Sequence, residues 1–140
     1  MNLKKLQIKN LLVGIALMLS ASLFAQDKTE VKAGVFQFET EIIDYGTITE
    51  NADGERTFKF KNVGTAPIII ANIKTSCGCT VPTKPKTAVL PGETGEIGVK
   101  YATNRIGAFS KSITVMSNAS ENAKILKIKG KVEKGKVSSL

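Results

Sequence analysis

Apolar and polar residues alternate one by one in a short segment that recurs, with variations, along most of this chain. The clearest example is Arg56–Lys61, in which Phe58 and Phe60 alternate with the polar residues Thr57, Lys59 and Lys61. Successive side chains of a β-strand point to opposite faces, so a period of two indicates a strand with one buried face. This segment is therefore predicted to be a strand with its phenylalanines inward and its lysines outward.

Six further segments carry the same alternation or a short apolar run. They lie at 35–39, 42–48, 68–73, 97–101, 109–115 and 126–132. Glycine, proline and asparagine separate them at intervals of roughly 8 to 12 residues, and no segment has a convincing helical period. Short strands at this spacing are typical of two packed sheets. The sequence therefore predicts an all-β sandwich.

The segment 68–73 differs from the others because it is apolar at every position except Asn72. An uninterrupted run of this kind predicts a strand that is buried on both faces. The stretch 80–95 is rich in proline and glycine and is predicted to be mostly connecting loop. The expected core, taken from the inward positions of the strands, is Phe38, Phe58, Phe60, Ile69, Ile73, Ile97, Val99, Ile113, Val115, Leu126 and Ile128.

The N-terminus has the pattern of a secretory signal. The first ten residues carry Lys4, Lys5 and Lys9 and no acid, and residues 11–25 are apolar or small. The apolar run is about 15 residues, shorter than the ~20 that a membrane-spanning helix needs. We expect a signal peptide at 1–25, cleavage between Ala25 and Gln26, and a periplasmic or secreted protein. A polar leader at 26–34 and a polar tail at 134–140 then flank the folded domain.

Charge gives little support to a nucleic-acid partner. Loss of the signal peptide lowers the formal charge from +8 to about +5. The remaining lysines are scattered along strands and have no aromatic residues between them, so a solvated basic face explains them better than a nucleic-acid site. We expect no nucleic-acid partner and no membrane span after cleavage. About 115 mature residues are enough to bury one hydrophobic core without metal or crosslinks.

The reactive side chains gather in one short motif. Cys77 and Cys79 are the only cysteines, and they lie within the candidate functional motif Ser76-Cys77-Gly78-Cys79-Thr80. A cysteine or serine nucleophile usually needs a positioned base, most often histidine, and the chain has none. The acidic residues show no spacing that singles out a catalytic pair. The sequence therefore predicts a protein that is not an enzyme, with no catalytic residues.

Three roles remain open for the cysteine pair. Two thiolates could hold a soft ion such as Cu(I), but a closed zinc site needs four ligands, so we assign no metal ligand and no cofactor. A disulfide needs a bend at Gly78, because residues i and i+2 of an extended strand are roughly 6.6 to 6.8 Å apart, at the limit of disulfide geometry. Its three-residue loop would add only about 1.6 kcal/mol. The third role is a tight turn filled by two small side chains.

Several motifs together resemble a family of exported bacterial proteins, the domain of unknown function 1573. The resemblance covers about residues 36–132. It rests on 58–67 (Phe-Lys-Phe-Lys-Asn-Val-Gly-Thr-Ala-Pro), 75–80 (Thr-Ser-Cys-Gly-Cys-Thr), Leu90-Pro91-Gly92-Glu93, Phe109-Ser110-Lys111 and Ser117-Asn118-Ala119. It implies an immunoglobulin-like antiparallel sandwich of about seven strands over residues 35–133, similar to the major sperm protein and hydin type. Such domains are mainly interaction modules, which implies a binding role without naming a ligand.

These observations lead to one functional hypothesis and one alternative. The chain is expected to be an exported, non-enzymatic β-sandwich module that binds another envelope or extracellular component. The alternative is a thiol-redox or soft-metal-handling protein that uses Cys77 and Cys79. The sequence does not identify the partner.

Overall fold

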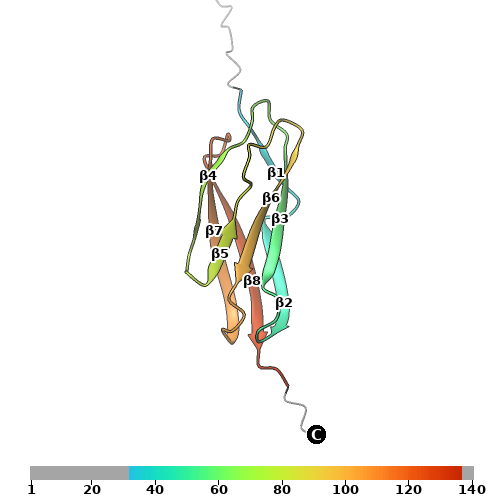
Figure 1. The fold of residues 1–140 in the computed structure, drawn as a ribbon, viewed down its shortest axis with the longest axis vertical. Coiled ribbons are helices and arrows are strands. Elements are labelled where there is room, and N and C mark those ends of the chain that lie inside the picture. The colour runs from blue at the N-terminus through green and yellow to red at the C-terminus, as the bar shows by residue number, and fades with distance from the viewer. Residues whose placement is uncertain (1–31, 137–140) are drawn as a thin grey trace, which may run out of the picture. The chain divides into compact units, whose positions relative to one another are not determined.

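The computed structural model describes residues 32–136 (Figure 1). The predicted signal peptide and its cleavage site lie outside these residues, as do most of the leader and the end of the tail. Within them no helix occurs. The strands are β1 (Phe36–Phe38), β2 (Ile42–Thr49), β3 (Glu55–Asn62), β4 (Ile70–Thr75), β5 (Thr80–Thr83), β6 (Thr94–Tyr101), β7 (Gly107–Ser117) and β8 (Ala123–Glu133).

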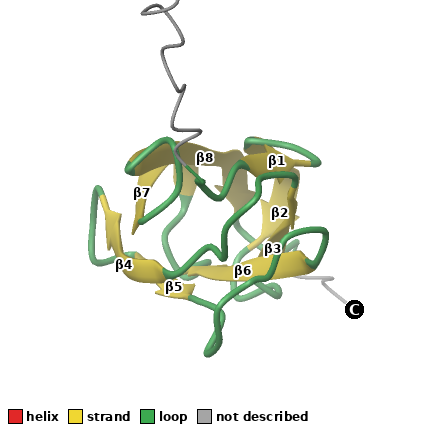
Figure 2. Ribbon diagram, turned by 90° about the horizontal axis from the view of Figure 1, so that it is seen from above, coloured by secondary structure: helices red, strands yellow, loops and turns green. Residues whose placement is uncertain are grey.

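The strands form two four-stranded sheets that face each other. Sheet A has the order β1-β3-β6-β5, and sheet B has the order β2-β8-β7-β4. Seen along the strands, β5, β6 and β3 lie in one layer and β7 and β8 in the other (Figure 2). The all-β sandwich predicted from the sequence is confirmed.

Strand β3 shows why the alternation leads to this architecture. Phe58 and Phe60 are fully buried between the sheets, and Lys59 lies on the outer face, where its amine is 3.7 Å from the Glu96 carboxylate of β6. Burying two phenylalanines contributes roughly 1.5 to 3 kcal/mol each, whereas the exposed ion pair contributes at most about 1 kcal/mol. The apolar face therefore sets the orientation of the strand.

One strand pair departs from the expected antiparallel arrangement. Strand β2 runs parallel to β8, and all other pairs in the described residues are antiparallel. The reason is the short link 39–41, which carries the chain from sheet A to sheet B and places β2 at the edge beside β8. The register shifts between Asp44 and Thr47, where Gly46 has a φ of 62°. Glycine adopts this left-handed conformation without steric cost.

The prediction for 68–73 was wrong in one respect. Ile69, which we expected in the core, is 55% exposed, whereas its neighbours Ile68 and Ile70 are buried. Strand β4 is an edge strand of sheet B and buries only its inner face. A register shift between Ile70 and Asn72 lets Ile73 also face the core. The isoleucine run therefore buries one face of a bulged strand, although its sequence suggests burial on both faces.

A second correction concerns 80–95. Residues 80–83 form β5 instead of loop, and β6 begins at Thr94. Pro82 has no backbone N–H to offer, but β5 lies at the edge of sheet A and needs only one hydrogen-bonded neighbour. Proline is tolerated at such an edge, which explains why its presence did not exclude a strand.

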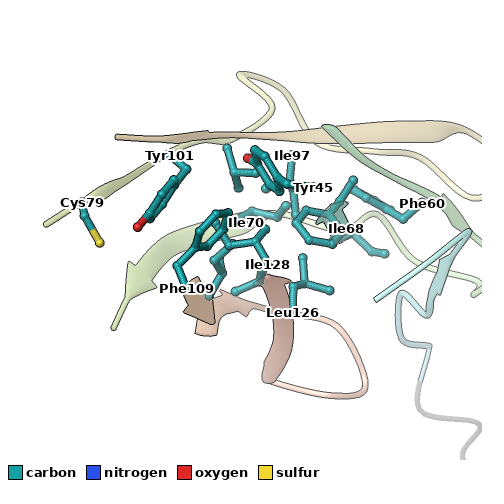
Figure 3. Close-up of a cluster of buried hydrophobic side chains, with 14 of the residues drawn as sticks. Tyr45, Phe60, Ile68, Ile70, Cys79, Ile97, Tyr101, Phe109, Leu126 and Ile128 are labelled. Atoms are coloured by element: carbon teal, nitrogen blue, oxygen red, sulfur yellow. The ribbon is translucent and has the colours of Figure 1, made fainter. Parts of the chain in front are cut away.

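The core agrees with the expected one except at Ile69. Eight expected members are buried, and Phe38 and Ile73 are partly buried against them. The structure adds two buried tyrosines and several aliphatic residues, seen in Figure 3. The aromatic rings form two clusters. Phe36, Phe38 and Phe60 pack at centroid distances of 4.9 to 5.3 Å, and a second cluster comprises Tyr45, Tyr101 and Phe109.

The loops divide between two ends of the sandwich, because neighbouring strands pair mostly antiparallel. The cysteine end consists of the loops 50–54, 76–79 and 102–106. The asparagine end consists of the loops 63–69, 84–93 and 118–122. Each aromatic cluster belongs to one end: the tyrosine cluster to the cysteine end and the phenylalanine cluster to the asparagine end.

Candidate functional site

The candidate motif lies where the chain passes from one sheet to the other. Residues 76–79, here called the cysteine turn, join β4 at the edge of sheet B to β5 at the edge of sheet A. Cys77 and Cys79 form a disulfide, and their Cα atoms are 5.3 Å apart. This distance is shorter than the roughly 6.6 Å of extended chain, so the backbone bends between the two cysteines as the bond requires.

Hydrogen bonds hold the cysteine turn on both sides. The Thr75 hydroxyl donates to the carbonyls of Cys77 (2.9 Å) and Thr80 (3.2 Å). Ser76 exchanges two bonds with Ser112 of β7. The N–H of Ala102 donates to the Cys79 carbonyl at 2.8 Å. The turn is therefore fixed by β7 and by the loop after β6, independently of the disulfide.

The two sulfurs differ in environment. Cys79 is 4% exposed and lies beside Tyr101 at one end of the core (Figure 3), whereas Cys77 is only partly buried. The Cys79 N–H donates to the Cys77 sulfur at 3.2 Å, and the Cys79 sulfur lies 3.9 Å from the Thr80 hydroxyl. Thr80 itself is buried.

Gly78 is exposed, and neither its backbone conformation nor its surroundings require glycine at this position. Its φ is not among the positive values, which occur at Gly46, Gly92 and Gly107. A Cβ atom added at Gly78 would meet nothing within 4 Å. The space outside the cysteine turn is therefore open.

A polar hollow of about 520 Å³ lies at the cysteine end, lined by 51–54 and 100–104. Gly54 forms part of the lining. Its carbonyl accepts hydrogen bonds from the Tyr101 N–H (3.0 Å) and the Tyr45 hydroxyl (2.8 Å). Burial raises the pKa of Tyr45 to about 12, so the hydroxyl stays a donor at neutral pH. The Arg56 guanidinium lies 4.4 Å from the centre of the Tyr45 ring.

The asparagine end is organised by one buried amide. The Asn62 side-chain oxygen accepts from the N–H groups of Val35 (3.2 Å) and Gly64 (3.0 Å). Its side-chain nitrogen donates to the carbonyls of Ala66 (2.8 Å) and Val89 (2.9 Å). All four bonding positions of this fully buried amide are used. The sequence indicated a turn here but not a buried centre, because an asparagine two residues before a glycine indicates only a turn.

Two other motifs of the resemblance also serve this end. The Asn118 side chain accepts from the Ile69 N–H (2.7 Å) and donates to the Pro67 carbonyl (3.1 Å). In the Leu90–Glu93 turn, Gly92 has a φ of 83°, and its N–H donates to the Asn62 carbonyl at 2.7 Å. The hydrogen bonds of these residues therefore stabilise the loops of this end. The cysteine motif, at the opposite end, is the one that leaves reactive atoms near the surface.

A row of exposed apolar side chains crosses the outer face of sheet B. Strand register brings Met116 opposite Ala123 and Ile42 opposite Lys127, and Ile125 lies diagonally between them. All three apolar residues are exposed, Ile125 by 62%. We call these three residues the apolar row. Sequence reasoning missed it, although Ile125 was visible as an apolar residue out of phase with the buried positions 126 and 128.

Lysines lie around the apolar row. The ion pairs of residues 32–136 engage Lys129 with Asp44 (3.4 Å) and Lys131 with Glu133 (2.8 Å). None of them includes Lys74 or Lys127, which also lie on this face by register. The outer face of sheet B therefore offers apolar contact beside uncompensated positive charge.

Three ionisable groups at the margins of this face are shifted by their neighbours. The Gly46 N–H, with help from Lys129, lowers the pKa of the Asp44 carboxyl. Hydrogen bonds to Glu41 and Glu121 raise the pKa of Lys124, and Glu133 raises the pKa of Lys131. All these shifts favour the charged forms.

The free edge of β4 is covered by a side chain. The Lys84 amine donates to the carbonyls of Ile70 (3.1 Å) and Ala71 (2.8 Å). These are edge carbonyls of sheet B, where an added strand would otherwise find acceptors. The amine reaches them from the loop that follows β5.

No cluster of three or more histidine, cysteine or acidic side chains comes together in the described part of the chain. Cys77 and Cys79 are the residues there whose sulfurs best suit a soft metal, and they are joined to each other. Within residues 32–136, no helix is long and apolar enough to cross a membrane.

A family model described as a protein of unknown function (DUF1573) matches residues 36–132. No curated protein matches the sequence significantly. A crystal structure of a protein of unknown function from Porphyromonas gingivalis W83 is similar, with 15% identity and a TM-score of 0.64 over 76% of this chain. The match spans about half of that structure, 51% of its length.

Two further solved structures share the sandwich. The PapD-like domain 7 of human CEP192 matches with 8% identity and a TM-score of 0.62, covering 83% of this chain and 97% of that one. The VesB protease of Vibrio cholerae matches with 9% identity and a TM-score of 0.54, covering 70% of this chain but 31% of that one. At these identities the likeness concerns the fold alone.

Proposed function

The chain belongs to the DUF1573 family, and from this premise we propose that it is an exported, non-enzymatic β-sandwich module that binds another component of the envelope or extracellular space. The observation that carries the proposal is the apolar row, in which Ile42, Met116 and Ile125 are exposed and are diagonal neighbours on adjacent strands. Single exposed apolar residues are ordinary, but contiguous ones beside charged residues are a feature of interaction surfaces.

The chemistry of the face defines the partner. Covering a half-exposed isoleucine contributes on the order of 1 kcal/mol, so the row alone supports a modest affinity. Lys74 and Lys127 beside it would favour a partner that presents carboxylates around an apolar patch. We therefore propose a protein partner with an apolar centre and an acidic rim.

The proposal excludes catalysis for a chemical reason. The whole chain contains no histidine, so a cysteine or serine nucleophile lacks its usual base. The similarity to a protease supplies no argument against this, because it covers 31% of that protein and rests on the fold.

Export is supported by the N-terminal sequence. Three lysines precede an apolar run of about 15 residues that ends at Ala25. We propose that the mature protein begins at Gln26 and acts in the periplasm or outside the cell. The motif Ser76–Thr80 stays a candidate functional motif, because its disulfide includes the partly exposed Cys77.

Site-specific photo-crosslinking in intact cells tests the binding proposal. A photoreactive phenylalanine analogue is placed at position 125, on the outer face of sheet B. The matched control is position 81 on the outer face of sheet A, because Val81 is 60% exposed and Ile125 is 62% exposed. We expect a discrete protein adduct from position 125 and none from position 81.

A second substitution makes the result specific. Ile42→Glu places a charge in the apolar row without touching position 125, and it should abolish the adduct. Retention of the adduct in this variant, or equal adducts from both positions, would contradict the proposal. Intact mass of the recovered protein reports export at the same time, since a species that retains residues 1–25 would overturn it.

A further inference from the structure

We propose that Cys77 is a site of thiol–disulfide exchange, that its ligand is a thiolate, and that Cys79 is the resolving sulfur that later releases the ligand. This chemistry goes beyond the binding role and does not depend on it, because it needs no partner at the apolar row. The proposal rests on the asymmetry of the two sulfurs, on the space outside Gly78, and on how little the fold needs the bond.

Accessibility decides which sulfur is attacked. Exchange requires a thiolate to approach one sulfur in line with the bond that breaks. Cys79 is 4% exposed and packs in the core, so its sulfur is closed to such an approach. Cys77 is partly exposed, and the residues on either side of it, Ser76 and Gly78, are exposed. Attack therefore occurs at Cys77.

Gly78 keeps the approach open. Neither its backbone conformation nor crowding calls for glycine, since its φ is not positive and an added Cβ would meet nothing within 4 Å. A larger side chain at this position would extend into the open space beside the two cysteines, where it could hinder an approaching thiolate. Glycine leaves that space free.

The exchange step balances without an outside oxidant. The incoming thiolate forms a bond to the Cys77 sulfur, the bond between Cys77 and Cys79 breaks, and Cys79 leaves with the electron pair as a thiolate. The hydroxyl of Thr80, 3.9 Å from the Cys79 sulfur, can donate to this thiolate before solvent supplies a proton. In the return step the Cys79 thiolate attacks Cys77 and expels the ligand, which regains the electron pair.

The surrounding structure tolerates the open state. The Thr75 hydroxyl, the Ser76–Ser112 bonds and the bond from Ala102 to the Cys79 carbonyl hold the turn without the disulfide. The Cys79 N–H donates to the Cys77 sulfur at 3.2 Å and links the backbone of one cysteine to the side chain of the other. These contacts keep the Cys79 sulfur close to the mixed disulfide after exchange.

The two single-serine variants form a matched test, because the chain has no other cysteine. Cys79→Ser leaves the accessible thiol and Cys77→Ser leaves the buried one. In the folded state, we expect Cys79→Ser to react with 5,5′-dithiobis(2-nitrobenzoate) at least about tenfold faster than Cys77→Ser. In urea the two rates should be equal. Equal rates in the folded state, or a faster Cys77→Ser variant, would overturn the assignment.

A shielding variant tests the role of Gly78 in the intact disulfide. Gly78→Leu should slow reduction of the native protein by glutathione severalfold while leaving the urea midpoint unchanged, with Gly78→Ala in between. An unchanged reduction rate would contradict the access argument. This result is independent of photo-crosslinking at position 125, so failure of one proposal is distinguishable from failure of the other.

Trapping in cells identifies the source of the thiolate. In Cys79→Ser the mixed disulfide cannot be resolved, so Cys77 should be recovered from thiol-blocked cells as an adduct. A small mass increase would identify a low-molecular-weight thiol, and a protein-sized adduct on a non-reducing gel would identify a partner cysteine. Recovery of Cys77 as an unmodified thiol would overturn the proposal.

Discussion

The two ends of the sandwich fix their loops by different means. At the asparagine end, the buried Asn62 amide joins three segments, and Asn118 adds a second, more exposed link. At the cysteine end, the loops are held by hydrogen bonds to the Gly54 carbonyl and by a disulfide between near neighbours in sequence. An open hollow lies at this end.

The difference separates structural motifs from a chemical one. A buried amide with all its bonds made cannot be removed without leaving several backbone groups unpaired, so the asparagine end serves stability. A disulfide that closes three residues removes little chain entropy, and hydrogen bonds surround it. The cysteine end can therefore change its covalent state without losing its shape.

The largest expected effect is at the asparagine end. Asn62→Ala leaves the N–H groups of Val35 and Gly64 and the Ala66 carbonyl without the amide partner, and each buried loss costs roughly 1 to 3 kcal/mol. We expect a loss of about 4 kcal/mol or more in a urea melt. Asn118→Ala is the control, and because its site is exposed to water it should cost about 1 kcal/mol. Similar losses for the two would show that Asn62 is not the centre of this end.

The next effect tests backbone closure at the cysteine end. Gly54→Ala would place a Cβ atom in a clash with the Tyr101 carbonyl oxygen. The backbone must move and the bonds to Tyr101 and Tyr45 weaken, at a cost of about 2 to 4 kcal/mol by thermal or urea unfolding. Gly78→Ala, where space is free, should change stability by less than about 0.5 kcal/mol. Equal losses of stability in Gly54→Ala and Gly78→Ala would contradict the view that Gly54 is crowded and Gly78 is not.

The disulfide should contribute less to the free energy of unfolding than Asn62 or Gly54. Replacing both Cys77 and Cys79 by serine is expected to lower the free energy of unfolding by less than about 2 kcal/mol, the size of a small-loop crosslink or two small side chains. Equilibrium unfolding in urea measures it. If the double variant fails to fold, the cysteine end matters to stability no less than the asparagine end, and the comparison no longer holds.

The smallest effect depends on pH. At neutral pH, Tyr45→Phe removes one hydrogen bond to Gly54 and should cost about 1 kcal/mol. Burial raises the pKa of Tyr45 from its ordinary 10 to about 12, so the folded state disfavours the phenolate. Stability that depends on the neutral hydroxyl is complete below about pH 10 and is lost as the pH rises towards about 12. Unfolding followed across that range should therefore show a smaller alkaline loss in Tyr45→Phe, and identical pH profiles would contradict burial of the hydroxyl.

Alternation was enough to predict most of the strands and the core. Phe58, Phe60, Ile113 and Leu126 are buried where a period of two places them. Ile69 was misplaced because the edge position of β4 and its bulge arise from tertiary pairing, which a local pattern does not contain. The parallel pairing of β2 with β8 was missed for the same reason.

The functional role of the motif at 76–80 stays a prediction. The bend at Gly78 that a disulfide needs is present, but the sequence could not tell the buried Cys79 from the partly exposed Cys77. That difference depends on packing against Tyr101. The apolar row was missed because its members come from three strands whose register only the fold defines.

Lys84 affects how readily the free edge of β4 can pair with a strand from another copy of the protein. Its amine occupies the outward carbonyls of Ile70 and Ala71. A strand from a second molecule would have to break these two hydrogen bonds and displace the amine before it could pair with β4 at these carbonyls. One flexible side chain thus disfavours strand pairing at this edge.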